Sequence, residues 1–206
     1  LQERKVTPST AIDCEGGKWV KKNFTIRDTS SQGVLPVDKV LRYSSNIGMA
    51  KIGLSMGAGT LHKYLHALGF GQHTAVPVAD SKGILRSPRG WSEVDIMSAA
   101  FGQSISVTGL QMAQAYLTLL NNGVHKPLRL IREDSRVEEA HPRVFRESAV
   151  REVMRMMRDV VEEKDGTGRR ARVEGIEVAG KTGTAQKADH RSGTYGSKRL
   201  ASFVGF

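Results

Sequence analysis

The clearest chemical pattern in this 206-residue sequence lies between Gly175 and Thr182, where the letters match the nucleotide-binding motif G-x-x-x-x-G-K-[ST]. In a phosphate-binding loop of this kind, an apolar strand precedes the first glycine and a helix begins at the lysine, so that the helix N-terminus faces the phosphates. The residues before Gly175 are mostly charged, residues 183–186 carry no helix start signal, and Ile176 and Val178 alternate as in a strand. The context therefore argues against a phosphate-binding loop.

The same lysine belongs to the tripeptide Lys181-Thr182-Gly183, and a second short motif, Ser44-Ser45-Asn46, lies far upstream of it. Either tripeptide alone is common by chance in a chain of ordinary composition. In this order, however, S-x-N and K-T-G are two of the three signature motifs of penicillin-binding proteins and class A β-lactamases. The third motif of that set, S-x-x-K, carries the nucleophilic serine.

Longer segments extend this resemblance. Residues 40–52 resemble the S-x-N region of class B penicillin-binding proteins, and residues 101–113 resemble the G-Q-x-x-x-V-T-x-x-Q entry to a helix in the same proteins. Residues 180–186 are similar to their K-[ST]-G-T-A strand. The similarity runs from about Ala11 to Phe206 and is strongest to the monofunctional septal transpeptidases of cell division.

The resemblance implies an α+β fold of the penicillin-binding and serine β-lactamase type, with an antiparallel sheet flanked by helices and a helical subdomain. It implies a peptidoglycan D,D-transpeptidase that cross-links D-Ala-D-Ala stem peptides through a serine acyl-enzyme and is a target of β-lactams. No cofactor and no metal are expected. The expected protein partners are membrane proteins of cell division or elongation. The parent protein is expected to be anchored in the cytoplasmic membrane with its catalytic domain on the extracytoplasmic side.

The resemblance also assigns roles to the S-x-N motif and to the lysine. Ser44 would relay a proton to the leaving amine, because a hydroxyl can donate and accept at once. Asn46 would bind the backbone of the donor peptide through its side-chain carbonyl and amide hydrogens. Lys181 would supply a fixed positive charge and help to orient Ser44.

The remaining roles fall on the strand that contains the lysine. Thr182 and Thr184 would bind the substrate carboxylate through their hydroxyl groups, and the backbone N–H of Thr184 would form half of the oxyanion hole. Gly183 would let the acyl chain lie along the strand as an added strand, since a side chain there would clash with it.

One departure from the family pattern is serious, because none of the lysines in the 206 residues has a serine three positions before it. We therefore expect a partial transpeptidase domain over residues 1–206, incomplete at both ends. It would lack the upstream S-x-x-K segment and a C-terminal strand and helix, and it would be inactive by itself. Two alternatives stay open: a non-catalytic penicillin-recognising sensor or scaffold, and a D,D-carboxypeptidase in which water replaces the acceptor amine.

Composition and charge exclude several other classes of protein. The chain is 39% hydrophobic and 25% charged, which is near the globular average and unlike collagen, coiled coils or disordered chains. A single cysteine, Cys14, excludes a disulfide framework. The net charge of +10 could suggest nucleic acid. We expect no nucleic-acid binding, because the arginines of residues 151–172 lie close to acidic residues and aromatic residues are scarce.

Two further features have ordinary explanations. The stretch from Ile96 to His125 has no charged side chain, but its glutamines, asparagines and glycines indicate the buried core of a globular domain rather than a lipid-exposed helix. His62 and His66 share a helix face, but Lys63 stands where a zinc protease has glutamate, so a solvated face is expected.

The hydrophobic periodicity predicts the elements that must position these motifs. No element is assigned to residues 1–35. Strands are expected to lead from about Val173 into residues 180–184 and again over residues 200–206, joined as an antiparallel hairpin by the loop 187–198. Helices are expected over residues 37–43, 47–56, 61–68 (capped by Thr60 and ended by Gly69), from Ser92 to Phe101, 109–120 (with a capping box from Thr108 to Gln111) and 148–163.

Overall fold

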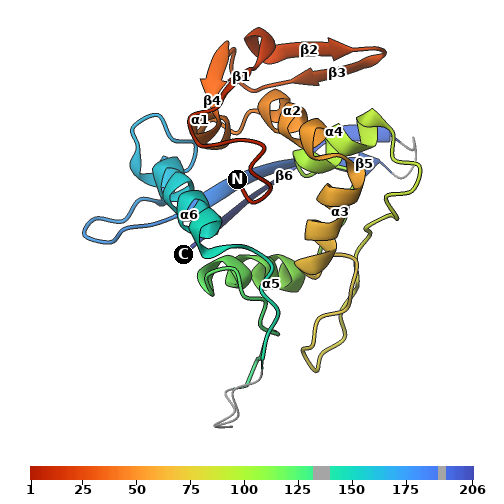
Figure 1. Cartoon of the computed structure of the whole chain (residues 1–206), viewed down its shortest axis with the longest axis vertical. Coiled ribbons are helices and arrows are strands. Elements are labelled where there is room, and N and C mark those ends of the chain that lie inside the picture. The colour runs from red at the N-terminus through yellow and green to blue at the C-terminus, as the bar shows by residue number, and fades with distance from the viewer. Residues whose placement is uncertain (132–139, 190–193) are drawn as a thin grey trace. The chain divides into compact units, whose positions relative to one another are not determined.

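The structure is a computed structural model that describes residues 1–131, 140–189 and 194–206 (Figure 1). It contains two compact units. The helical unit comprises residues Leu1–Lys5 and Ile52–Arg151, and the sheet unit comprises Val6–Lys51 and Glu152–Phe206. The S-x-N and K-T-G motifs therefore both belong to the sheet unit.

The longer elements in the described part of the helical unit are helices, namely α3 (Ala58–Ala67), α4 (Glu93–Ala100), α5 (Gly109–Leu120) and the last turns of α2 (Asn46–Met56). Helix α2 approaches α4 closely at Gly53, where an added Cβ would lie 2.4 Å from the Cβ of Ala100. A glycine is therefore needed at this crossing. In the described part of this unit, β pairing is limited to isolated bridges, which agrees with the expected helical subdomain.

The uncharged stretch from Ile96 to His125 covers the end of α4, a loop and α5, and it contributes to the core of the helical unit. Met97 is 1% exposed, and Gln111 and Thr118 are fully buried. The buried amide of Gln111 is satisfied, because its Nε2 donates to the carbonyl of Gln72 at 2.7 Å. The prediction of a buried core is thus confirmed. No helix in the described ranges is both long and apolar enough to cross a membrane.

Capping residues set the starts of α4 and α5 as the sequence predicts. The hydroxyl of Thr108 accepts from the backbone N–H of Gln111, whose side chain accepts in turn from the N–H of Thr108. Ser92 and Asp95 form the same reciprocal pair at the start of α4. Both helix starts are therefore fixed by side chains close in sequence, which is why the sequence could predict them.

The predicted start of α3 is wrong, and its predicted end is confirmed. Helix α3 begins at Ala58 after Gly57, whose φ of 78° makes the turn, so Thr60 lies inside the first turn and is not the cap. At the other end Gly69 has a φ of 93°, and the N–H of Phe70 donates to the carbonyl of Leu65. This is the pattern of a helix closed by a left-handed glycine.

The sheet unit contains three separate pairs of antiparallel strands, so the described strands do not form one continuous sheet. The first 36 residues, which were largely unassigned, supply two of these pairs. The strands are β1 (Ala11–Asp13) with β4 (Val34–Pro36), β2 (Lys18–Lys21) with β3 (Phe24–Arg27), and β5 (Gly180–Asp189) with β6 (Thr194–Gly205). Short 3-10 turns lie at Glu15–Gly17 and Arg169–Ala171.

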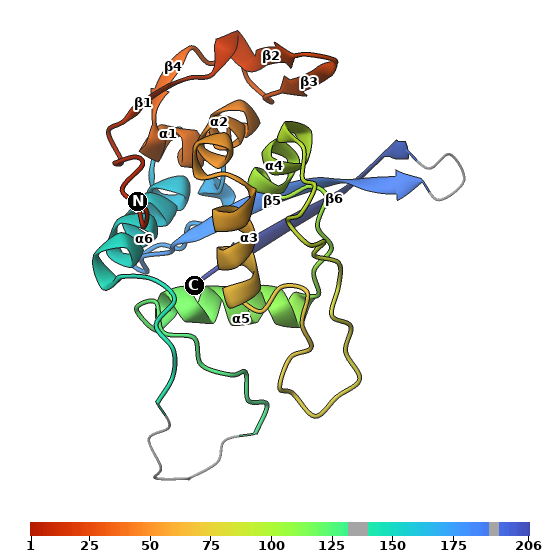
Figure 2. The same ribbon diagram turned by 45° about the vertical axis from the view of Figure 1, so that its right-hand side comes forward.

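Strands β5 and β6 form the long hairpin in Figure 2, with Gly180 opposite Gly205 and Thr184 opposite Ala201. The hairpin is confirmed, but its expected loop over 187–198 is too long, because pairing continues as far as Asp189 opposite Thr194 after an irregularity at residues 186–188. The strand also begins later than predicted. Residues 173–176 form a tight turn closed by a bridge, and β5 starts at Gly180.

Helix α1 (Val37–Arg42), the larger part of α6 (Glu147–Glu162) from Glu152 onward and the first turns of α2 complete the sheet unit. Its core includes Cys14, Val40, Ile47, Val160 and Val161, all fully buried. Helix α6 is amphipathic as predicted, since its apolar face supplies two of these residues.

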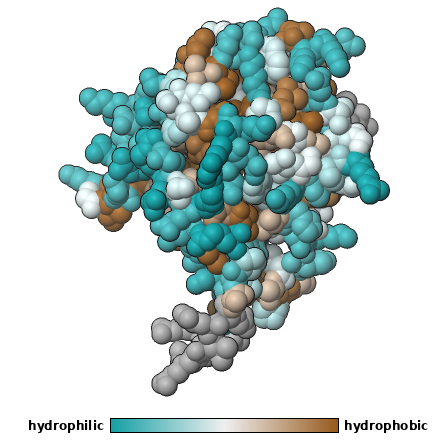
Figure 3. Space-filling view, viewed as in Figure 1, coloured by the Kyte–Doolittle hydropathy of each residue, from teal (hydrophilic) through white to brown (hydrophobic). Residues whose placement is uncertain are grey.

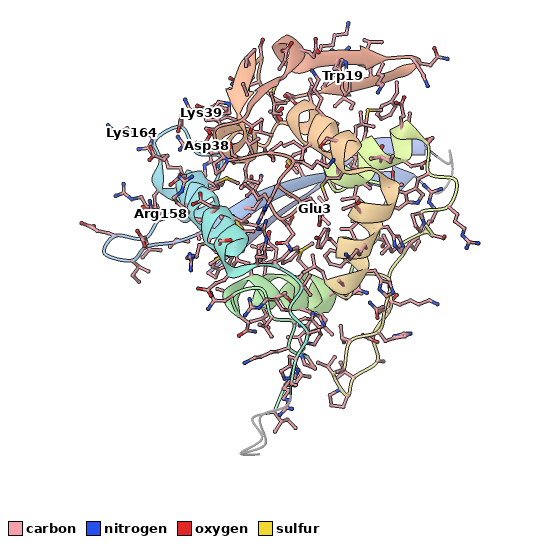
Figure 4. The ribbon with its side chains drawn as sticks, viewed as in Figure 1. Glu3, Trp19, Asp38, Lys39, Arg158 and Lys164 are labelled. Atoms are coloured by element: carbon pink, nitrogen blue, oxygen red, sulfur yellow. The ribbon has the colours of Figure 1, made fainter. Side chains whose placement is uncertain are left out.

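The opposite face of α6 carries arginines that are paired with acids. Arg158, labelled in Figure 4, lies 3.1 Å from Glu177, and Arg155 lies 3.3 Å from Glu152. The visible surface is largely hydrophilic, with apolar patches between the polar side chains (Figure 3). These ion pairs account for part of the basic character of the α6 sequence.

Candidate active site

The S-x-N motif lies at the junction between α1 and α2, as its position in the sequence predicts. Helix α1 ends in a left-handed turn centred on Ser44, whose φ is 57°. The N–H of Ser44 donates to the carbonyl of Leu41 at 3.2 Å, and the N–H of Ser45 donates to that of Val40 at 3.0 Å. Glycine is the usual residue at this position of a helix end, because a Cβ makes the left-handed conformation costly. Ser44 is thus held in a strained backbone conformation.

The side chain of Ser44 meets the lysine of the second motif. Nζ of Lys181 donates to Oγ of Ser44 at 2.8 Å and to the carbonyl of Thr182 at 3.0 Å. Burial lowers the pKa of the Lys181 ammonium to about 8 from 10.5. Two segments 137 residues apart in sequence therefore place a hydroxyl against an amine that can exchange its proton near neutral pH.

Ser45, the middle residue of the motif, is 2% exposed and caps α2. Its Oγ accepts from the N–H of Gly48 at 3.0 Å and lies 2.5 Å from a carboxylate oxygen of Asp28. The other oxygen of Asp28 accepts from the N–H of Ile47. Ser45 and Asp28 together satisfy two of the donors left free at the start of the helix. Ser45 is therefore a structural residue, whereas its neighbour Ser44 faces the lysine.

Asn46 begins α2, and one of its amide hydrogens is used within the chain. Its Nδ2 donates to the carbonyl of Arg27, at the end of β3, at 2.9 Å. This bond fixes the orientation of the amide group. One of the two amide hydrogens of Asn46 therefore already has a partner. The side chain can offer a peptide its carbonyl oxygen and one amide hydrogen, fewer groups than expected from the sequence.

The backbone of β5 presents an open edge beside this pair. The N–H and carbonyl of Ala179 both bond to Phe206, so residue 179 and every second residue after it point their backbone groups toward β6. The N–H groups of Thr182 and Thr184 therefore point away from β6. In the described ranges β5 pairs with β6 alone, so these groups face an edge at which an extended peptide can add.

Successive side chains of β5 point to opposite faces of the strand. Lys181 and Gly183 lie on one face of the strand, and Thr182 and Thr184 lie on the other. The hydroxyl of Thr182 contacts that of Thr167 at 3.3 Å. A Cβ at Gly183 would lie 2.7 Å from Oγ of Ser202, so the absence of a side chain also leaves room for β6.

Among the described residues, no group of three or more His, Cys, Asp or Glu could hold a metal ion. The rings of His62 and His66 are stacked with centroids 6.0 Å apart. Burial and the neighbouring His66 lower the pKa of His62. The groups at the S-x-N junction are hydroxyls, an amine, an amide, the carboxylate of Asp28 and backbone N–H groups.

This combination of groups agrees with a comparison to known families. Residues 1–206 match the family described as the penicillin binding protein transpeptidase domain. The chain belongs to this transpeptidase family.

Individual relatives of this transpeptidase domain carry consistent names. A Neisseria gonorrhoeae protein named "Probable peptidoglycan D,D-transpeptidase PenA" is 36% identical over 184 residues, which cover 88% of this chain and 31% of the relative. Peptidoglycan D,D-transpeptidase FtsI of Escherichia coli is 34% identical over 181 residues, which cover 87% of this chain and 30% of that protein. The chain thus spans about 30% of the length of these curated relatives.

A solved structure confirms the fold class. The apo structure of the TP domain from Burkholderia pseudomallei penicillin-binding protein 3 is 33% identical, with a TM-score of 0.93 over 99% of this chain and 61% of that one. The expected α+β fold of the penicillin-binding type is therefore confirmed.

Two features of the transpeptidase domain escaped the sequence analysis. Asp28 joins the S-x-N junction from the end of β3, and Thr167 contacts both Thr182 and the carbonyl of Arg42. The sequence around Thr167, Asp165-Gly166-Thr167-Gly168, is a plain turn signal that carries no sign of a functional role. A turn signal placed shortly before K-T-G is the one clue that could have singled it out.

Proposed function

We propose that the protein is a peptidoglycan D,D-transpeptidase that links stem peptides through a serine acyl-enzyme and is acylated by β-lactams at the same serine. The observation that carries this proposal is the 2.8 Å contact between Nζ of Lys181 and Oγ of Ser44, which unites the S-x-N and K-T-G motifs. The names of the relatives support the reaction class.

The reaction has two covalent steps. In the first, the oxygen of the nucleophilic serine bonds to the carbonyl carbon of the penultimate D-Ala, and the C–N bond to the terminal D-Ala breaks. The proton lost by the serine passes to the leaving amine through Ser44, whose hydroxyl donates one hydrogen while it accepts another. In the second, an amine of a neighbouring stem peptide attacks the ester carbonyl, and the serine oxygen leaves and regains a proton.

The nucleophilic serine and its general-base lysine come from an S-x-x-K segment outside these 206 residues. The absence of that motif from the sequence supports this part of the proposal. The 206 residues contribute the proton relay, the lysine charge and the strand that receives the peptide, and they are inactive without the nucleophile.

The substrate binds along the open edge of β5. The backbone N–H of Thr184, which points away from β6, forms half of the oxyanion hole, where it stabilises the charge that develops on the carbonyl oxygen. The hydroxyls of Thr182 and Thr184 bind the substrate carboxylate, and Gly183 lets the peptide lie close to the strand. Asn46 binds the peptide backbone with its carbonyl and its remaining amide hydrogen.

The proposed reaction places the domain where peptidoglycan is assembled. Stem peptides are cross-linked outside the cytoplasmic membrane, so the catalytic domain is extracytoplasmic. The anchor of the whole protein in that membrane is what the family resemblance implies. Membrane proteins of cell division or elongation are its partners. This placement rests on the proposed substrate.

The test measures acylation of the full-length protein by a fluorescent penicillin. Ser44→Ala removes the proton relay, and we expect the acylation rate to fall by about 100-fold to 10,000-fold. Lys181→Ala removes the charge, and we expect a loss of about 100-fold or more. Ser55→Ala, an exposed serine of α2, is the matched control and should acylate like wild type. Wild-type rates in both site variants would refute the assigned roles.

Two further arms complete the experiment. The 206-residue chain alone should form no covalent adduct, and a stable adduct would contradict a nucleophile outside it. Products formed from a stem peptide with and without an added acceptor amine distinguish transfer from hydrolysis. Release of D-Ala without a cross-linked product would favour a D,D-carboxypeptidase.

A further inference from the structure

The carboxylate of Asp165 contacts the side chains of Arg42 and Tyr43, the two residues before Ser44. One carboxylate oxygen lies 3.2 Å from Nη1 of Arg42, and the other accepts from the hydroxyl of Tyr43 at 2.6 Å. The hydrogen bond from Tyr43 lowers the pKa of Asp165, so the carboxylate is ionised at neutral pH. A single acid in the turn after α6 therefore holds two consecutive side chains at the end of α1.

The same turn also holds the backbone of α1. The hydroxyl of Thr167 donates to the carbonyl of Arg42 at 2.9 Å. The carbonyls of Lys39, Val40 and Leu41 accept from the N–H groups of residues 43, 45 and 44, respectively. All four final carbonyls of the helix, which lack partners inside a helix, are thus satisfied. The left-handed turn at Ser44 is held from both its backbone and its flanking side chains.

The turn that supplies Asp165 and Thr167 is itself constrained. The N–H of Gly168 donates to the carbonyl of Val160 at 2.9 Å. A Cβ at Gly166 would lie 2.2 Å from that carbonyl oxygen, so the close return of the chain onto α6 requires glycine there. The turn therefore has little freedom to move relative to α6.

Three acids surround the guanidinium of Arg42, but their contacts differ. Its side chain is 12% exposed and lies 3.5 Å from Asp159 and 4.0 Å from Glu163. Those two acids contact Arg42 alone at this helix end, whereas Asp165 also holds Tyr43. Asp165 is therefore the acid whose loss would free both side chains that precede Ser44.

We propose that Asp165 is a positioning residue that, through Arg42 and Tyr43, fixes the left-handed turn of Ser44 so that its hydroxyl stays against Lys181. This inference rests on the proposed function, because the position of Ser44 matters to the reaction only if Ser44 relays the proton. Asp165 itself does not touch the reacting atoms. Misplacement of a reacting group by about 1 Å can cost on the order of 100-fold in rate.

The test compares Asp165→Ala with Glu163→Gln in the full-length protein. Fluorescent penicillin gives both the fraction of molecules that acylate and the rate at which they do so. We expect Asp165→Ala to acylate about tenfold to 100-fold more slowly with an unchanged final fraction. A residue that merely stabilises the fold would lower the fraction and leave the rate intact. Glu163→Gln should match wild type in both.

A second variant and a second measurement keep the inference open to refutation. Tyr43→Phe removes one hydroxyl and should give a smaller loss of rate, even if Asp165→Ala does not fold. Hydrogen exchange at the amides of Ser44 and Ser45 should accelerate in both variants, because their bonds to α1 loosen. Unchanged rates and unchanged exchange in the folded variants would overturn the inference. If wild type itself is not acylated, the proposed function fails. The exchange data still test whether the contacts of Asp165 with Arg42 and Tyr43, here called the Asp165 clamp, hold the turn at Ser44.

Discussion

Two adjacent serines, Ser44 and Ser45, each contact a charged group, yet their surroundings differ in almost every other respect. Ser45 is buried, caps α2 and shares its contacts with the half-buried carboxylate of Asp28, which has a second donor in Ile47. Ser44 has a left-handed backbone and touches Lys181, an amine whose pKa burial lowers to about 8. Ser45 supplies hydrogen bonds to the start of α2, whereas Ser44 is held in a strained backbone conformation.

The difference indicates that, at the junction between α1 and α2, one serine stabilises the fold and the other is positioned for the reaction. Strained backbone conformations and buried charges lower the stability of the fold, and they persist where the surrounding structure fixes them. The bonds around Ser45 stabilise the start of α2, and the clamp from Asp165 fixes the end of α1. Between these two anchors the chain can hold Ser44 in a conformation that it would not adopt by itself.

The largest stability effect should come from Lys181→Met, which removes the buried charge. Below pH 8 the lysine is protonated in both states, and its burial costs the folded state. Between pH about 8 and 10.5 the folded state loses the proton first, so the stability of wild type rises with pH. At pH 7 the buried charge lowers the stability of wild type relative to the variant, and this penalty, on the order of 3 kcal/mol, should disappear toward pH 10.5.

Urea unfolding of the full-length protein at several pH values, followed at the transition of this domain, measures that penalty. Lys18→Met, at an exposed lysine of β2, is the matched control for the loss of a lysine side chain. A difference in the free energy of unfolding between Lys181→Met and wild type that stays constant between pH 7 and 10.5 would show that burial does not lower the pKa of Lys181. Ser44 would then no longer contact an amine with a lowered pKa, which is one of its differences from Ser45.

Ser45→Ala should act in the opposite direction, with a smaller effect. The change removes the cap of α2 and one partner of the Asp28 carboxylate, so the free energy of unfolding should fall by about 1–3 kcal/mol. The acylation rate of the molecules that remain folded should change little. Ser55→Ala in the same helix is the control for stability, measured by urea unfolding. If Ser45→Ala slowed acylation without loss of stability, the division between the two serines would be wrong.

The sequence predicted those parts of the molecule in which the deciding contacts are local. The starts of α4 and α5 depend on side chains three residues away, and the end of α3 depends on Gly69. The start of α3 was mispredicted because Thr60 resembles a cap, while the backbone freedom of Gly57 decides the matter. The short strands before residue 37 were missed because their pairing joins segments with no clear alternation of apolar residues.

The site was predicted as two motifs and a set of roles taken from a family. Periodicity placed the S-x-N motif at a helix junction, but it could not show that Ser44 adopts a left-handed conformation or that Ser45 is buried. Those properties depend on Asp28, Asp165 and Thr167, which lie far away in sequence and carry no signal of their own. Contacts over such separations follow from the tertiary fold and not from local pattern.

The smallest effect, and the most direct test of strain at Ser44, compares Ser44→Gly with Ser44→Ala. Both variants lack the hydroxyl and so lose the same contact with Lys181, and they differ in backbone freedom alone. Because the φ of 57° suits glycine, the glycine variant should be more stable by about 1 kcal/mol in urea unfolding. At Ser55, inside α2, the same comparison should favour alanine by about 1 kcal/mol. Equal preferences at the two positions would mean that the turn at Ser44 stores no strain, and the end of α1 would then need no clamp to hold it.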